Sequence, residues 1–442
     1  MKRILLASIV IAIAARSACG APSAPPALAE LPSPLDLRGA IGYALDHNYA
    51  IQQAREAIRL QEGVIVQVKS RQIPNISAQG QWQKNDASIS TFYPPATSLW
   101  SVEFMATQTL FAGGGVQSSI KGAKLTREAT AYDLQTTIDS ALLDVRTKFY
   151  NVLLARERIR VAEEDVQLYE HQLEDTKNQF ASGTVSNFEV LRAKVFLANA
   201  QPALITARNS YRIAIEQLRQ SLGTPGSSSF PEVVGDLNFE PVRYDAESAL
   251  ASAREHRPEL RRLGKLQDAA EQSVTTARAN FYPSLQAFGA YQWDGINFAN
   301  PVYGNENVNG WMFGLQSTWS IFDGRATDGK VRQAKSQLEQ ARISVASEEL
   351  EIDVEVRQAI STLQEAGELV TASKQTIEQA AEALRLAEAK YHAGSATQLD
   401  VLTSQVALTQ AKTDQLTANY NYLVALANVR KAIGLSDALV TP

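Results

Sequence analysis

The chain has 442 residues, of which 45% are hydrophobic and 20% are charged, and its formal net charge is −5. This length permits a substantial core in two or three domains, and so mild a charge does not favour nucleic-acid or acidic partners. Cys19 is the only cysteine, so neither an intramolecular disulfide nor a cysteine metal site is expected.

The N-terminal segment has the pattern of a secretory signal. Lys2 and Arg3 precede a twelve-residue apolar run that ends at Ala15, which is too short for a membrane-spanning helix of about 20 residues. We predict a signal peptide and Pro-rich leader over residues 1–29. Cleavage after Ala29 and processing at a lipidated Cys19 are alternatives. No later run reaches 18 apolar residues, so membrane insertion of the mature chain would have to use β-strands.

The mature chain is an internal duplication. His47 matches His256 (256 − 47 = 209), and the segment FASGTVSNFEVL from Phe180 matches YHAGSATQLDVL from Tyr391 (391 − 180 = 211). Repeats of this kind mark tandem structural units. We therefore predict repeat 1 over 35–223, a Pro/Gly/Ser-rich linker over 224–245, repeat 2 over 246–434 and a tail over 435–442.

Each repeat is predicted to begin with a helix and to continue with two strands, at about 73–84 and 98–111, and at about 282–293 and 310–322. Apolar and polar residues alternate in these runs, which is the strand signal. Aromatic residues near the predicted strand ends suit a membrane interface; they are Trp82, Trp100, Tyr291, Trp293 and Trp311. An antiparallel sheet on a soluble core is the alternative.

Long helices follow over 113–182 and 325–393. Large apolar residues recur every seven positions from Val145 to Phe180 and from Val356 to Tyr391, a coiled-coil stripe. Gly183 and Gly394 are predicted to end these helices. Returning helices are predicted over 187–222 and 398–433, opened by capping boxes at Ser186–Glu189 and Thr397–Asp400. Each repeat thus contains an antiparallel helical hairpin.

Four strands cannot close a membrane barrel, because the small barrels have about eight and an open edge in lipid leaves backbone groups unpaired. Three copies of the chain would supply twelve strands. The same symmetry would gather the long helices into a cylinder continuous with the strands.

The ordered and duplicated motifs resemble those of the TolC family of trimeric outer-membrane efflux proteins. The resemblance rests on Leu37-x-x-Ala40-Ile41-x-x-Ala44-Leu45-x-x-Asn48, on Leu110-Phe111-Ala112-Gly113-Gly114 with its repeat Ile321-Phe322-Asp323-Gly324-Arg325, and on Tyr391-x-x-Gly394-x-x-x-x-Leu399-Asp400-Val401-Leu402. It implies a mixed α and β membrane protein: a trimeric channel-tunnel with a twelve-stranded transmembrane β-barrel, four strands per chain, continued by a twelve-helix periplasmic α-barrel of coiled-coil hairpins.

The resemblance also implies a function. The protein would be a passive exit duct in the outer membrane of a Gram-negative bacterium, exporting small molecules, metal ions or proteins without a cofactor. Its implied partners are two further copies of itself, outer-membrane lipid, a periplasmic adaptor (membrane fusion) protein and an inner-membrane pump of the RND, ABC or MFS type.

By the same resemblance, Asp400, Glu189 and Tyr391 are candidates for the periplasmic gate. The sequence departs from the family pattern at Ala396 and Thr403, where closing residues would stand. The alternatives are that both carboxylates cap their own helices and that Tyr391 packs in the heptad stripe. Adaptor contact is expected at the hairpin tips, which comprise Gly183, Thr184, Val185, Ser186, Gly394, Ser395, Ala396 and Thr397.

An enzymatic function is not favoured. The four histidines are scattered outside metal-binding spacings, and no nucleophile elbow, phosphate loop or catalytic carboxylate pair stands out. A periplasmic coiled-coil adaptor or scaffold without a pore is the alternative function. It would account for the heptads but would leave the duplicated strand pairs without a role.

Overall fold

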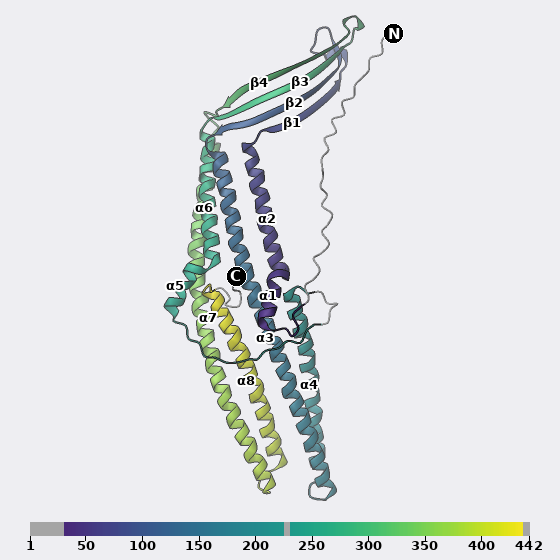
Figure 1. Cartoon of the computed structure of the whole chain (residues 1–442), viewed down its shortest axis with the longest axis vertical. Helices are drawn as coiled ribbons and strands as arrows, with labels where there is room; N and C mark the ends of the chain where they lie inside the picture. The colour runs from purple at the N-terminus through teal and green to yellow at the C-terminus, as the bar shows by residue number, and fades with distance from the viewer. Residues whose placement is uncertain (1–30, 225–229, 436–442) are drawn as a thin grey trace.

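A computed structural model describes residues 31–224 and 230–435. The predicted leader with Cys19 and the cleavage site after Ala29 lies outside the described residues, as do 225–229 of the linker and 436–442 of the tail. The chain is elongated, with a β-sheet at one end and two helical hairpins at the other (Figure 1).

The sheet has four antiparallel strands in the order β1-β2-β3-β4. They are β1 (Asn75–Lys84), β2 (Ala96–Ala112), β3 (Ser284–Phe298) and β4 (Asn305–Thr318). Each repeat contributes one hairpin, and β2 pairs with β3 across the two repeats. Among the described residues, β1 pairs only with β2 and β4 only with β3, so both outer edges of this four-stranded sheet carry unpaired backbone groups.

The strands of the second hairpin differ from the prediction. β3 continues five residues beyond 293, β4 begins five residues before 310, and β4 ends at Thr318 rather than 322. The added pairs include Asp294 with Val308 and Asn297 with Asn305, because backbone ladder bonds do not require the apolar alternation that the prediction used.

This longer hairpin corrects the placement of three aromatic residues. Tyr291 and Trp311 face each other near the middle of β3 and β4, and Trp293 also lies inside its strand rather than near its end. Trp82 and Trp100 are paired close to the ends of β1 and β2, as predicted.

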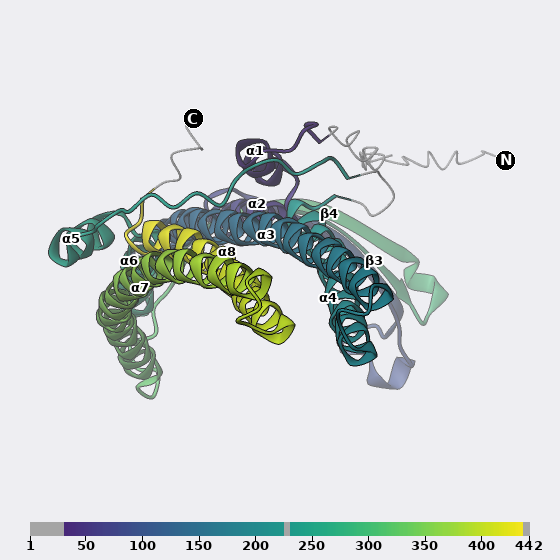
Figure 2. The same cartoon turned by 90° about the horizontal axis from the view of Figure 1, so that it is seen from below.

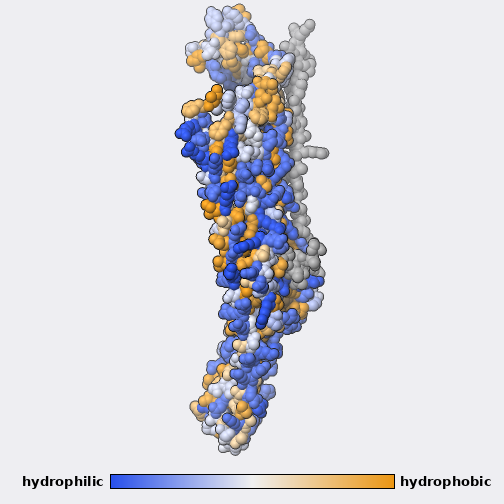
Figure 3. All heavy atoms as spheres, turned by 90° about the vertical axis from the view of Figure 1, so that its left-hand side faces the viewer, coloured by the Kyte–Doolittle hydropathy of each residue, from blue (hydrophilic) through white to orange (hydrophobic). Residues whose placement is uncertain are grey.

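Large hydrophobic side chains are exposed on the sheet, and among the described residues no helix covers the edge strands. Every residue of β1 is exposed, and large side chains of β4 such as Trp311 and Phe313 are 71% and 77% exposed. Figure 3 shows hydrophobic residues interspersed with hydrophilic ones over this end and in patches along the helices below it. Such a surface requires an apolar environment or further chains.

The single helix predicted at the start of each repeat is in fact two helices. Repeat 1 has α1 (Leu37–His47) and α2 (Tyr49–Lys69), and repeat 2 has α5 (Ala246–His256) and α6 (Pro258–Arg278). Asn48 adopts extended angles and its side chain accepts a hydrogen bond from the Ala50 amide at 2.9 Å, which starts α2. In repeat 2 the break falls at Arg257, because the following proline disfavours a helical residue before it.

The long helices α3 (Gly115–Ala181) and α7 (Ala326–His392) have 67 residues each, about 100 Å at 1.5 Å per residue. They return as α4 (Asn187–Leu222) and α8 (Gln398–Ala432). Short 3₁₀ turns flank the strands at Ser70–Gln72, Ala87–Ile89, Ala279–Phe281 and Pro301–Tyr303. Within the described ranges, none of the helices combines the length and apolarity needed to cross a membrane.

Two hydrophobic clusters, one per repeat, hold the middle of the molecule together. The predicted heptad residues Val145 and Val152 pack with Leu218 in the first cluster, and Val356 and Leu363 pack in the second. The first cluster also includes the linker, which pairs with the segment before α1. Figure 2 shows the helices as a curved wall, with α1 and the linker on the convex side.

Candidate functional site: the helical hairpin tips

Both long helices end in the same backbone turn. Gly183 and Gly394 have φ values of 79° and 75°, which is a conformation that glycine adopts without strain. The Thr184 amide donates to the Gln179 carbonyl and the Ser395 amide to the Lys390 carbonyl, each at 2.9 Å. These bonds are those of a Schellman motif, which satisfies the last carbonyls of a helix. The duplicated glycine therefore serves the same turn twice.

The two tips are exposed and uncharged. Of the eight predicted tip residues, all are exposed except Val185 and Ala396, which are partly buried. Segments 181–188 (ASGTVSNF) and 393–399 (AGSATQL) contain no charged residue. A partner that binds these segments would meet small side chains, hydroxyl groups, backbone and the exposed side chains of Phe188 and Leu399, with no charged group inside either segment.

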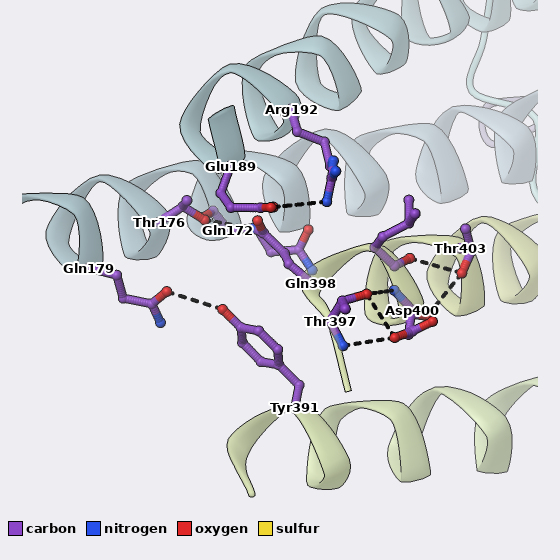
Figure 4. A network of polar contacts seen from close by, with 11 residues as sticks. Gln172, Thr176, Gln179, Glu189, Arg192, Tyr391, Thr397, Gln398, Asp400 and Thr403 are labelled. Atoms are coloured by element: carbon purple, nitrogen blue, oxygen red, sulfur yellow. Dashed lines mark hydrogen bonds and ion pairs between the residues drawn. The ribbon is translucent and has the colours of Figure 1, made fainter. Parts of the chain in front are cut away.

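The second returning helix opens with the predicted capping box. The Thr397 amide and hydroxyl both donate to Asp400 Oδ2 at 2.8 Å, and the Asp400 amide donates to the Thr397 hydroxyl at 3.3 Å. The hydrogen bonds from the Thr397 backbone and side chain lower the pKa of the Asp400 carboxyl. The structure therefore assigns Asp400 a capping role (Figure 4).

The capping box predicted at the first returning helix is absent. Ser186 makes no side-chain capping bond, and Glu189 instead accepts two hydrogen bonds from Arg192 Nη1, at 3.0 and 3.2 Å. A basic residue three positions further along the helix lies within reach of the carboxylate. That ion pair takes the place of the bond back to Ser186.

The two hairpins contact each other just above the tips. The Tyr391 hydroxyl of α7 donates to Gln179 Oε1 of α3 at 3.1 Å. Gln398 Nε2 at the start of α8 donates to Thr176 Oγ1 of α3 at 2.6 Å, and both of these residues are buried. Gln172 adds a buried side-chain oxygen without a partner beside them. Figure 4 shows these side chains directed across the gap between the hairpins.

Gln398, Thr176 and Gln179 were missed by the sequence analysis. The available signal was a difference between the repeats, since Thr176 is the repeat equivalent of Ala387 (387 − 176 = 211) and carries a hydroxyl that its equivalent lacks. Neither Ala396 nor Thr403 joins the contact, since Thr403 donates to the backbone carbonyls of Leu399 and Asp400 in its own helix. The link between the hairpins just above the tips is thus made of uncharged groups.

The comparison with known proteins decides the family. The model of the family "Outer membrane efflux protein" matches residues 40–224 and 249–435, which is most of both repeats. The chain belongs to the outer membrane efflux protein family. This match removes the basis for the alternative of a scaffold without a pore.

Relatives and a solved structure agree with this assignment. Nodulation protein T of Rhizobium leguminosarum bv. trifolii is 25% identical over 398 residues, covering 88% of this chain and 83% of the relative. Outer membrane protein TolC of Escherichia coli K12 is 26% identical over 312 residues, covering 68% and 62%. The Campylobacter jejuni CmeC outer membrane channel has the same fold, with a TM-score of 0.78 at 16% identity over 91% of this chain and 87% of that one.

This outer membrane efflux protein is accordingly a channel protein of the Gram-negative outer membrane with a periplasmic helical extension. Its four strands and the hairpins α3/α4 and α7/α8 are one protomer's share of a channel-tunnel. Three protomers provide the twelve strands that close the sheet edges left open in one chain.

Proposed function

We propose that this protein is the passive exit duct of a tripartite export system, in which an inner-membrane pump and a periplasmic adaptor deliver small molecules, metal ions or proteins to its helical end. The observation that carries the proposal is the pair of equivalent, uncharged hairpin tips on one chain. In a trimer they make six similar tips around one mouth. The scattered histidines and the absence of a catalytic motif in the sequence support a channel rather than an enzyme.

The contacts above the tips would hold the mouth closed. The bond from Tyr391 to Gln179 and the bond from Gln398 to Thr176 join the second hairpin to the first near the tips, so this end of the hairpins can separate only when both bonds break. One neutral hydrogen bond contributes about 1 kcal/mol, which is about a fivefold change in an equilibrium constant. If three protomers open together, the loss of one bond in each would favour opening about 100-fold.

Planar-bilayer recordings of the purified trimer test this gate. Tyr391→Phe keeps the ring and removes the hydroxyl, and we expect a higher open probability at unchanged single-channel conductance. Tyr49→Phe is the matched control, because Tyr49 is 60% exposed on α2, far from the tips. Equal open probabilities for the two variants would contradict the gate.

We propose that Asp400 also forms a cation-binding site near the same mouth. Its Oδ2 atom is engaged by Thr397, but a carboxylate has further acceptor capacity, and three copies around an axis would attract cations. We therefore expect multivalent cations to block conductance, and we expect Asp400→Ala to relieve the block. Unchanged block in Asp400→Ala would leave Asp400 with the capping role alone.

The tips are the proposed adaptor contact. Cys19 is the only native cysteine, so single cysteines introduced elsewhere, with Cys19 replaced by Ser, can report proximity. In intact cells, Ser395→Cys should cross-link to the periplasmic adaptor, whereas Gln201→Cys, exposed further along α4, should not. Equal cross-linking at both positions would place the adaptor along the helices instead of at the tips.

A further inference from the structure

A cavity of about 430 Å³ lies between α3, α4 and α8. Apart from Ala155, which also belongs to the first hydrophobic cluster, its lining residues lie outside both clusters, and the cavity is separate from the tip contacts. Its lining combines small apolar residues with seven polar ones, and the latter are Asn151, Arg158, Asp165, Thr206, Ser210, Thr409 and Thr413. The volume is in the range of small-molecule sites in proteins.

The cavity opens on the side of α3 that faces away from the linker. Leu153 and Ala162 are nine residues apart, which at 100° per residue places them on opposite sides of the helix. Leu153 packs in the cluster that includes the linker, and the Arg156 guanidinium donates to the Val233 and Gly235 carbonyls of the linker at 3.0 and 2.8 Å. Ala162 lines the cavity. Since the linker lies on the convex side of the helical wall (Figure 2), the cavity faces the concave side.

One acidic and one basic side chain line the cavity without pairing. Asp165 accepts a hydrogen bond from the Thr409 hydroxyl at 2.6 Å, and Arg158 Nη2 donates to the Thr417 hydroxyl at 3.0 Å. In the described part of the chain neither belongs to a salt bridge, and the nearby Lys412 pairs with Glu164 at 3.0 Å. Burial raises the pKa of the Asp165 carboxyl, against the hydrogen bonds from Thr409 and Gln405. The site therefore holds a partly desolvated acceptor and a separate cationic donor.

The spacing of the two charges defines what they can bind together. Arg158 and Asp165 are seven residues apart on α3, which is about 10 Å along the axis. The surface between and opposite them is made of short side chains, with Ala155 and Ala162 on α3 and Ala203 and Ala207 on α4. These alanines leave room for an organic body between the charged ends.

The fold itself does not require these charges. At the offset of 211, Arg158 corresponds to Leu369 and Asp165 to Thr376, and Thr376 only donates to the backbone of its own helix at 3.0 Å. The second repeat thus builds the same long helix with a leucine and a threonine at these places. The acid and the base are specific to the first repeat, where the cavity lies.

We propose that this cavity binds a zwitterionic organic molecule whose cationic and anionic groups are about 10 Å apart, with the cation at Asp165 and the anion at Arg158. A peptide of three residues with free termini has this span when extended. This inference rests on the proposed function in one respect: in an export channel the concave side faces the lumen, so the cavity is a binding site in the channel wall. Binding in the cavity itself does not depend on conduction.

Calorimetric titration of the detergent-solubilised trimer with tri-alanine tests the proposal. N-acetylation should weaken binding at least about tenfold, as expected for a lost hydrogen bond to a charged group, and so should C-terminal amidation. Asp165→Asn should weaken tri-alanine binding to a similar extent and make it insensitive to acetylation. Arg158→Gln should make binding insensitive to amidation. The control is Glu174→Gln, since Glu174 is exposed on the same helix and does not line the cavity.

Several results would overturn the proposal. They are the absence of saturable tri-alanine binding, equal binding of the blocked peptides, and unchanged binding in both substituted proteins. Should Asp165→Asn or Arg158→Gln fail to assemble, Arg158→Leu and Asp165→Thr replace them. These two substitutions introduce the residues that the second repeat carries at the equivalent positions of its long helix, so we expect them to fold. The conductance of the wild-type trimer is measured in parallel. A trimer that binds tri-alanine but does not conduct would contradict only the proposed function. A trimer that conducts but does not bind tri-alanine would contradict only the proposed binding in the cavity.

Discussion

We expect Asn48 to hold the junction of α1 and α2 against the C-terminal end of α4. The side chain is 9% exposed, and its Nδ2 donates to the Ser221 carbonyl at 2.7 Å, while its Oδ1 accepts from the Ala50 and Ile51 amides at 2.9 and 3.3 Å. Arg257, its repeat equivalent, reaches the Ala432 carbonyl at 3.4 Å, which is the equivalent of Ser221. One residue per repeat therefore connects three helix ends.

The effect of Asn48→Ala follows from these bonds. Loss of an N-cap destabilises a helix by about 0.5–2 kcal/mol, and a buried polar group left without a partner costs about 1–3 kcal/mol. The sum, roughly 1.5–5 kcal/mol, would raise the local opening equilibrium about 10- to 4,000-fold at 1.4 kcal/mol per factor of ten. Asn48→Asp keeps the capping oxygen but removes the donor to Ser221, so its effect should be intermediate.

Hydrogen exchange measured by mass spectrometry is the assay, because it reports local opening. Protection of peptides at the start of α2 should fall in Asn48→Ala, whereas peptides at the start of α6 serve as an internal reference. Gln52→Ala is the matched control, since Gln52 makes only an exposed hydrogen bond to the Asp46 carbonyl. A change below about threefold, or equal loss at α2 and α6, would refute the reasoning.

Three further predictions concern stability. Arg257→Ala should lower the stability of the trimer by about 3–5 kcal/mol, seen as a lower thermal midpoint at fixed concentration, because Glu259, with its side chain 15% exposed, would lose its partner. Phe149→Ala should cost about 3–5 kcal/mol in the same assay, since Phe149 is 1% exposed in the first cluster. Because the hydrogen bonds from Thr397 lower the pKa of Asp400, the stabilisation of the first turn of α8 is fully present above the ordinary aspartate pKa of 3.8 and is lost as pH falls through the lower pKa of the folded state. Hydrogen exchange at the start of α8 should therefore accelerate in that acidic range, and Asp400→Asn should abolish this pH dependence.

Much of the architecture could be predicted from local pattern. The seven-residue period from Val145 and from Val356 predicts α3 and α7, and Gly183 and Gly394 mark where each helix turns. These features depend on residues a few positions apart, so the period and the turn chemistry are visible in the chain itself. The duplication strengthens these predictions, because each pattern occurs twice in the chain.

The predictions from the sequence were wrong where another group made an interaction that the local pattern does not include. Ser186 and Glu189 have the spacing of a capping box, but Arg192 binds the carboxylate instead. The end of β3 and the start of β4 were misplaced because backbone pairing continued through polar residues such as Asp294. In both cases a neighbouring group supplied an interaction that the spacing alone did not include.

The sequence by itself determined the two repeats, the long helices, the turns that end them and the family resemblance, since periodicity and spacing encode them. Only the tertiary structure decided that β2 pairs with β3, that Gln398 meets Thr176 across 222 positions, and that α3, α4 and α8 enclose a cavity beside Asp165. The physical reason is that these contacts join residues far apart in the chain, whose meeting depends on how whole helices and strands pack and not on any local preference.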